Sequence, residues 1–148
     1  MATFTQIFYH IVFSTKERQP VLTGERRDGL FRYIGGIVRN QKGVLYASNG
    51  PGDHLHLLLD LHPTICLSNL MKDIKIASGK WIKENHAFPN FDYWQEGYGA
   101  FTHSARDKQS LMQYIANQQE HHQRVSFLDE LQLLLIEAGI EYEEKYLV

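Results

Sequence analysis

Cysteine, proline and long apolar runs are all scarce in this chain. Its one cysteine, Cys66, excludes an intrachain disulfide and a zinc site built from cysteines. No stretch approaches the roughly 20 consecutive apolar residues that a transmembrane helix needs. Residues 1–6 lack the basic flank and apolar core of a signal peptide. These absences predict a cytoplasmic protein, and the 43% hydrophobic content argues against disorder.

Histidine and charge are distributed unevenly. Eight histidines occur among 148 residues, which is about twice the share of an ordinary globular protein. The formal net charge is −2, but residues 1–110 hold 13 basic and 10 acidic side chains, whereas residues 111–148 hold 2 and 7. The acidic excess belongs to the C-terminal end, which leaves room for a basic, nucleic-acid-binding face elsewhere. The length predicts a single domain, 1–148.

The hydrophobic pattern predicts four strands and four helices. Strands are expected over 4–14, 44–48, 54–61 and 97–103. Helices are expected over 23–40, 64–85, 104–122 and 126–139, the last two starting with Ser-x-x-Asp capping boxes. The order β-α-β-β-α-β followed by two helices is that of the split βαβ, or ferredoxin-like, fold. We therefore predict an α+β protein with a four-stranded, mainly antiparallel sheet, helices on one face, and additional C-terminal helices.

Two histidines, His54 and His56, flank Leu55 on the third predicted strand, directly after a Gly-Pro-Gly-Asp turn. Strand side chains alternate, so both imidazoles point to one face and offer two ligands of a metal site. The alternative is a pair of surface histidines on a half-exposed strand. A polar pair at the head of an apolar run is harder to explain by packing. Asp53 either orients an imidazole or caps its own turn.

Tyr114 and Gln118 are four residues apart on the third predicted helix, so their side chains share one face. The structural alternative is a half-buried tyrosine with a solvated hydroxyl. Taken with the histidine pair, Gln118 offers a neutral oxygen ligand and Tyr114 a nucleophilic oxygen. His121 and His122 end this helix, where DNA contact is one alternative and solvated side chains that complement the helix dipole are what we expect.

These motifs and their surroundings resemble the single-tyrosine HUH transposases, which serve the simplest insertion sequences, and their relatives associated with repetitive palindromic elements. The His-Leu-His at 54–56 matches the His-hydrophobic-His motif, and Tyr114 with Gln118 matches Tyr-x-x-x-Gln. Residues 9–20 are similar to the family's first strand and turn, and residues 94–101 to the segment before its catalytic helix. The resemblance covers nearly the whole chain.

The resemblance implies a dimeric, metal-dependent enzyme that cleaves and rejoins single-stranded DNA at ends marked by hairpins. On that basis His54, His56 and Gln118 hold one divalent cation, Mg²⁺ or Mn²⁺, although two histidines also suit Zn²⁺ or Ni²⁺. Tyr114 would attack the scissile phosphate and form a covalent 5′-phosphotyrosine intermediate. The family also implies sites shared between subunits, with the tyrosine helix of one chain beside the histidines of the other.

Eight basic residues on the first two predicted helices are either phosphate contacts or the solvated faces of those helices. They are Arg26, Arg27, Arg32, Arg39, Lys72, Lys75, Lys80 and Lys83. Trp94, Tyr98 and Phe101 either stack on bases or belong to the core.

Other functions stay open at this point. A non-catalytic single-stranded nucleic-acid-binding module on the same fold would be indifferent to a chelator and to Tyr114→Phe. A metal-dependent hydrolase would cleave DNA without becoming linked to it. A domesticated HUH endonuclease would process repetitive palindromes with the same residues. A replication initiator or relaxase is disfavoured, because those proteins commonly have longer chains or carry a helicase.

Overall fold

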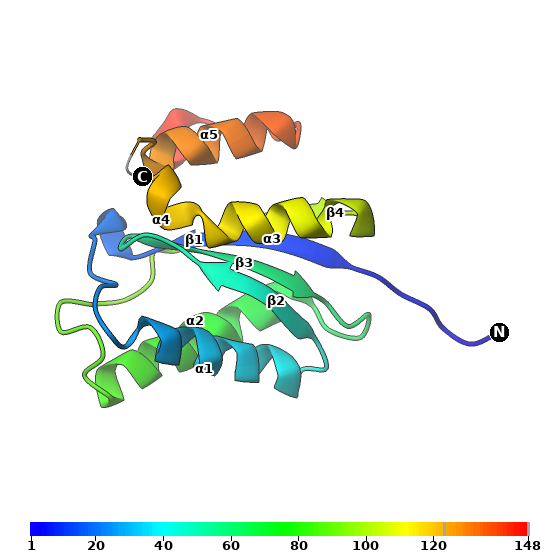
Figure 1. Ribbon diagram of the computed structural model, residues 1–148, viewed down its shortest axis with the longest axis horizontal. Coiled ribbons are helices and arrows are strands. Elements are labelled where there is room, and N and C mark those ends of the chain that lie inside the picture. The colour runs from blue at the N-terminus through cyan, green and yellow to red at the C-terminus, as the bar shows by residue number, and fades with distance from the viewer. Residues whose placement is uncertain (123, 148) are drawn as a thin grey trace.

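The computed structural model describes residues 1–122 and 124–147 (Figure 1). Its strands β1 (Phe8–Ser14), β2 (Val44–Asn49), β3 (His54–Asp60) and β4 (Gly99–His103) form one sheet in the order β2-β3-β1-β4. Every neighbouring pair in this sheet is antiparallel. The predicted four-stranded sheet is confirmed, although its first strand begins at Phe8 and not at residue 4.

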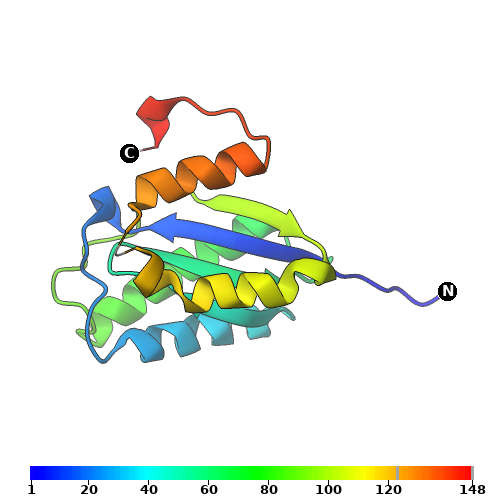
Figure 2. The same ribbon diagram turned by 45° about the horizontal axis from the view of Figure 1, so that its top comes forward.

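Helices cover both faces of the sheet. On one face lie α1 (Arg27–Asn40) and α2 (Leu67–Glu84), and on the other lie α3 (Lys108–Ala116), α4 (Gln118–His121) and α5 (Phe127–Glu137) (Figures 1 and 2). The predicted α+β fold with its βαββαβ order is confirmed. The C-terminal helices cover the face that the first two helices leave open. No helix in the described ranges is long and apolar enough to cross a membrane.

The first two helices start later than predicted. α1 begins at Arg27 and not at residue 23, because the chain turns at Gly24, whose φ is +97°. α2 begins at Leu67 and not at residue 64, because the Ile65 amide donates to the His62 carbonyl in a turn.

The segment predicted as one helix over 104–122 is divided. A 3-10 turn (Ala105–Asp107) precedes α3, and Asn117, with φ −94° and ψ 10°, separates α3 from α4. The capping box predicted at Ser104 is wrong, since its side chain makes no cap hydrogen bond to the described residues. At the second predicted capping box the N-cap is confirmed, because Ser126 Oγ accepts from the Asp129 amide at 3.2 Å where α5 begins.

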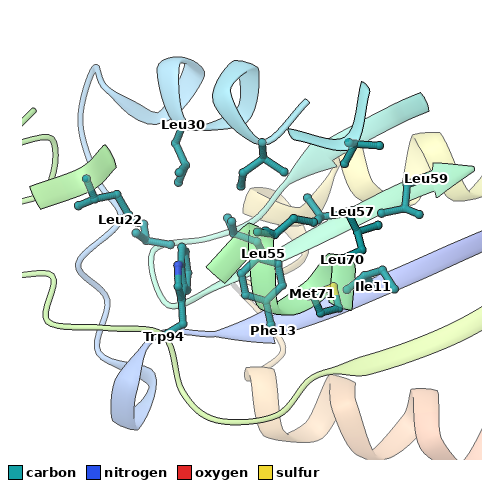
Figure 3. Packing of buried hydrophobic residues seen from close by; sticks show 14 of the residues in the cluster. Ile11, Phe13, Leu22, Leu30, Leu55, Leu57, Leu59, Leu70, Met71 and Trp94 are labelled. Atoms are coloured by element: carbon teal, nitrogen blue, oxygen red, sulfur yellow. The ribbon is translucent and has the colours of Figure 1, made fainter. Parts of the chain in front are cut away.

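The main hydrophobic core fills the space between the sheet and the α1–α2 layer (Figure 3). Ile11 and Phe13 of β1 pack there with Leu55, Leu57 and Leu59 of β3. Because β3 is an inner strand covered on both faces, it is buried at every position before its last. Alternation along the strand turns its two histidines to the opposite face, beneath the C-terminal helices.

A smaller apolar cluster holds α5 on that opposite face. Val12 of β1 and Phe101 of β4 pack with Phe127 and Leu135 of α5, and all four are buried. In Figure 2, α5 accordingly runs alongside β4 and β1. Few buried residues anchor α5, so its position depends strongly on the polar contacts described below.

Candidate metal centre

The turn that leads into β3 is held by Arg27 of α1. Its guanidinium donates to the backbone carbonyls of Leu22 (2.6 Å), Pro51 (3.3 Å) and Gly50. Glycine is required at position 50, because a Cβ there would lie 2.1 Å from the His54 carbonyl oxygen. This turn therefore determines where β3 begins and in which direction its histidines point.

His54 is fully buried and is oriented by Asp53. The two are linked between His54 Nδ1 and Asp53 Oδ1 at 2.7 Å, so the ring donates its Nδ1 proton to the carboxylate. Asp53 is therefore the imidazole-orienting residue, which was one of the two predicted alternatives. Burial alone would lower the pKa of His54, but the hydrogen bond to Asp53 and the nearby Glu130 carboxylate outweigh it and raise that pKa.

His56 is also fully buried and is backed by a residue that the sequence analysis missed, His10 of β1. His56 Nδ1 lies 2.8 Å from His10 Nε2, and the two rings stack with centroids 5.0 Å apart. Burial, followed by the neighbouring His56, lowers the pKa of His10 to about 3. His10 shares a face of β1 with Val12, and Val12 pairs with His56; only the first of these relations can be read from the sequence.

Tyr114 and Gln118 reach the same site from α3 and α4. The Tyr114 hydroxyl donates to Glu130 Oε2, and the Tyr114 ring lies 5.8 Å from the ring of His56. Gln118 is fully buried, and its Nε2 donates to Glu130 Oε2 at 3.0 Å. Burial and the Glu130 carboxylate raise the pKa of Tyr114 above its usual value.

Glu130 of α5 lies at the centre of the site and was not predicted. Its side chain is 2% exposed, and its Oε1 lies 2.9 Å from both His56 Nε2 and His122 Nε2. Burial alone would raise the pKa of Glu130, but the neighbouring imidazoles of His122, His54 and His56 hold it far below the usual range. The available signal was an acidic residue on the apolar face that Phe127 begins.

The expectation that His121 and His122 are solvated is wrong for His122. Its side chain is 6% exposed and contacts Glu130, because the chain turns after α4 and brings α5 back over the site. His121 is more exposed, at 33%, yet its Nε2 lies 3.4 Å from Glu130 Oε2.

A divalent cation fits this group of side chains. One candidate ligand atom from each of His54, His56, His122 and Glu130 lies within 4.8 Å of the other three. Two buried atoms, His54 Nε2 and Gln118 Oε1, have no hydrogen-bond partner among the described residues. An unshared pair on a buried nitrogen or oxygen is unfavourable unless a donor or a cation satisfies it. The chemistry of these donors therefore suits a divalent metal ion.

The eight basic candidates belong to α1, α2 and the residue before α1, on the face of the sheet away from this site (Figure 1). Arg27 donates to backbone carbonyls, and Lys75 donates to the carbonyls of Gln95 and Gly97. Four others are exposed and are Arg32, Arg39, Lys72 and Lys83. The remaining two lie beside neighbouring side chains, with Arg26 over Trp81 at 5.9 Å and Lys80 3.7 Å from Glu84.

Two of the three aromatic candidates for base stacking belong to the core. Trp94 is 6% exposed and its indole N–H donates to Ser78 Oγ at 3.0 Å, while Phe101 is 7% exposed. Tyr98 is 40% exposed and remains accessible.

Comparison with known proteins identifies the family. Residues 3–118 match the family model described as IS200-like transposase. The chain is 30% identical over 121 residues to the transposase of insertion sequence element IS200 from Salmonella typhimurium, covering 76% of each protein. It is 27% identical over 122 residues to the ISDra2 transposase TnpA from Deinococcus radiodurans, covering 78% of this chain and 86% of that relative.

Solved structures agree with this match. A transposase candidate from Deinococcus radiodurans R1 has a TM-score of 0.63 and 28% identity, and the similarity covers 80% of this chain and 95% of that one. A REP-associated tyrosine transposase bound to a REP hairpin shares the fold, with a TM-score of 0.56, 17% identity, and coverage of 84% and 76%. The family match ends at Gln118, so His122 and Glu130 lie beyond it. The resemblance inferred from the sequence is confirmed, and the chain belongs to the IS200-like transposase family.

Proposed function

We propose that this transposase cleaves and rejoins single-stranded DNA at ends marked by hairpins, with Tyr114 as its nucleophile. One observation carries the proposal: the Tyr114 hydroxyl meets the same Glu130 carboxylate as His56 and Gln118. The nucleophile and the candidate metal ligands therefore belong to one cluster. Family membership supports the reaction class, and the hairpin bound by the REP-associated relative supports the kind of substrate.

His54, His56 and Gln118 would hold one divalent cation, Mg²⁺ or Mn²⁺. When bound, the cation polarises the scissile phosphate and favours the phenolate form of the nucleophile. The three ligands are neutral, which leaves the positive charge available to the anionic substrate. Asp53 binds Nδ1 of His54, and His10 binds Nδ1 of His56. These contacts orient both imidazoles so that their Nε2 atoms face the site.

The Tyr114 oxygen forms the bond to phosphorus as the bond from phosphorus to the 3′ oxygen breaks. The phenolic proton is lost, and the departing 3′ oxygen gains a proton to become a hydroxyl. Tyr114 keeps the 5′ phosphate, so the energy of the bond is retained. A second 3′ hydroxyl attacks this phosphotyrosine and reseals the strand without ATP. Since burial and the Glu130 carboxylate raise the pKa of Tyr114, the phenol is favoured while α5 is docked.

The remaining parts of the proposal concern the assembly and its DNA contacts. Residues 1–148 would form one transposase domain that acts as a homodimer in the cytoplasm. The exposed basic residues of α1 and α2, together with Arg26 just before α1, would contact the phosphates of the hairpin; they are Arg26, Arg32, Arg39, Lys72, Lys80 and Lys83. Arg27 and Lys75, which donate to backbone carbonyls, would support the fold instead.

A covalent-adduct assay tests the chemistry. Labelled single-stranded hairpin oligonucleotides from the DNA flanking the gene would be incubated with protein and Mg²⁺ or Mn²⁺ and separated under denaturing conditions. We expect a protein–DNA band that disappears with EDTA, with Tyr114→Phe and with His54→Ala. Tyr33→Phe, on α1, is the matched control and should leave the band unchanged. Cleavage without the band would favour a plain hydrolase, and binding without cleavage would favour a non-catalytic module or relic.

Mixing two inactive variants tests whether subunits share a site. If the histidines of one chain work with the tyrosine of another, Tyr114→Phe mixed with His56→Ala regains adduct formation. If each chain uses its own residues, as the contact between Tyr114 and Glu130 within one chain suggests, the mixture stays inactive.

A further inference from the structure

We infer that Glu130 and His122 are metal ligands, so that a divalent transition ion such as Zn²⁺ or Mn²⁺ joins the C-terminal helix to the histidines of β3. The site would consist of His54, His56, His122 and Glu130. It keeps His54 and His56 of the proposed function and adds two ligands that lie after Gln118, outside the family match. The inference rests on the metal site of the proposed function and on none of its DNA chemistry.

When the His54 ring is neutral, its contact with Glu130 brings two hydrogen-bond acceptors together. Asp53 takes the Nδ1 proton of His54, so a neutral His54 ring presents an unprotonated Nε2. That nitrogen faces Glu130 Oε1 at 3.3 Å and has no hydrogen-bond partner among residues 1–122 and 124–147. A cation between the nitrogen and the carboxylate oxygen converts this unfavourable contact into two coordinate bonds.

The spacing of the donor atoms suits a single ion. His56 Nε2 and His122 Nε2 are each 2.9 Å from Glu130 Oε1, and His54 Nε2 is 3.3 Å from it. Ligands about 2.1 Å from a metal are separated by roughly 3.0–3.4 Å at octahedral or tetrahedral angles. The separations between Glu130 and the three histidines are close to those values, and a bound ion would displace the protons that His56 and His122 share with Glu130. Three nitrogens and one carboxylate oxygen also form a donor set that favours a transition ion over Mg²⁺.

The fold gives this ion a structural consequence. α5 is held by the small cluster around Phe127 and Leu135, and Glu130 points from the same helix into the site. A buried carboxylate without a compensating charge destabilises the helix that carries it. A cation shared by the carboxylate and the β3 histidines supplies that charge, so metal binding should stabilise α5 in its docked position.

Competition with a chromophoric chelator tests the ligand assignment on the full chain. Zn²⁺ and Mn²⁺ affinities would be measured for the wild type, Glu130→Gln and His122→Ala. Glu137→Gln, an exposed site on the same helix, is the matched control. We expect each ligand variant to weaken binding at least about 10-fold, and the control to bind as the wild type does. Metal should also raise the melting temperature of the wild type more than that of Glu130→Gln.

Gln118→Ala separates the two possible ligand sets. If Glu130→Gln and His122→Ala bind metal as tightly as the wild type, the inference is overturned, and loss of affinity in Gln118→Ala would then assign the ion to the smaller set. Because these measurements need no DNA, they remain valid if the covalent adduct is never found. A positive adduct assay with unchanged affinity of Glu130→Gln would overturn this inference while leaving the proposed function intact.

Discussion

Replacing Arg27 by methionine should destabilise the protein through the turn that precedes β3. The guanidinium makes charge-assisted hydrogen bonds to the carbonyls of Leu22, Gly50 and Pro51. Such bonds contribute about 1.5–3 kcal/mol each, but Arg27 is half-buried, and water would satisfy part of what the variant exposes. We therefore expect a loss of about 2–4 kcal/mol in the free energy of unfolding, from a total of roughly 5–15 kcal/mol.

Thermal and urea denaturation of the chelator-treated protein would measure this loss. At about 3 °C per kcal/mol for a domain of this size, the melting temperature should fall by roughly 6–12 °C. Arg32→Met, an exposed site on the same helix, is the control and should change stability by less than about 0.5 kcal/mol. Unchanged stability of Arg27→Met, together with weaker hairpin binding and a salt dependence reduced by about one phosphate contact, would refute the structural role.

Three further predictions concern the supports of the site. Gly50→Ala should lower stability by at least about 1–3 kcal/mol and weaken metal binding, because the added Cβ would lie 2.1 Å from the His54 carbonyl oxygen. Denaturation and chelator competition would measure these two effects. Leu57→Ala, in the main core, should cost about 2–5 kcal/mol in urea denaturation. In EDTA, the free energy of unfolding should fall as pH drops from about 6.5 towards 3. In this range His10 binds a proton in the unfolded chain but stays neutral in the native protein, where its pKa is lowered to about 3. His10→Gln should make the free energy of unfolding less dependent on pH in this range.

The sheet and the layer of α1 and α2 could be predicted because they follow local patterns. Apolar runs, turn residues and helix periodicity are properties of neighbouring residues, and they identified β3 and its turn correctly. The break at Asn117 could not be predicted, because a helix over 104–122 satisfies the same periodicity. Where α5 docks depends on Phe127 and Leu135 meeting two strands far away in sequence, and no local pattern contains that information.

In the candidate site, too, the sequence predicted relations between neighbouring residues and missed those that depend on how the elements pack. Spacing alone related His54 to His56 and Tyr114 to Gln118, because each pair lies on one element or on adjoining helical turns. Glu130 escaped prediction because its role depends on the return of α5 over the sheet. His10 and His122 escaped for a related reason: each gains its partner only through contacts between elements.

The inner position of β3 divides the site into parts of unequal local stability. Its backbone is hydrogen-bonded to β1 and β2 and buried on both faces, so the amides around His54 and His56 should exchange with solvent only when the whole domain unfolds. Tyr114 and Glu130 belong instead to helices on the lightly anchored face, which can open in smaller units. The protein can thus loosen the part that carries the nucleophile and still keep its paired imidazoles in register.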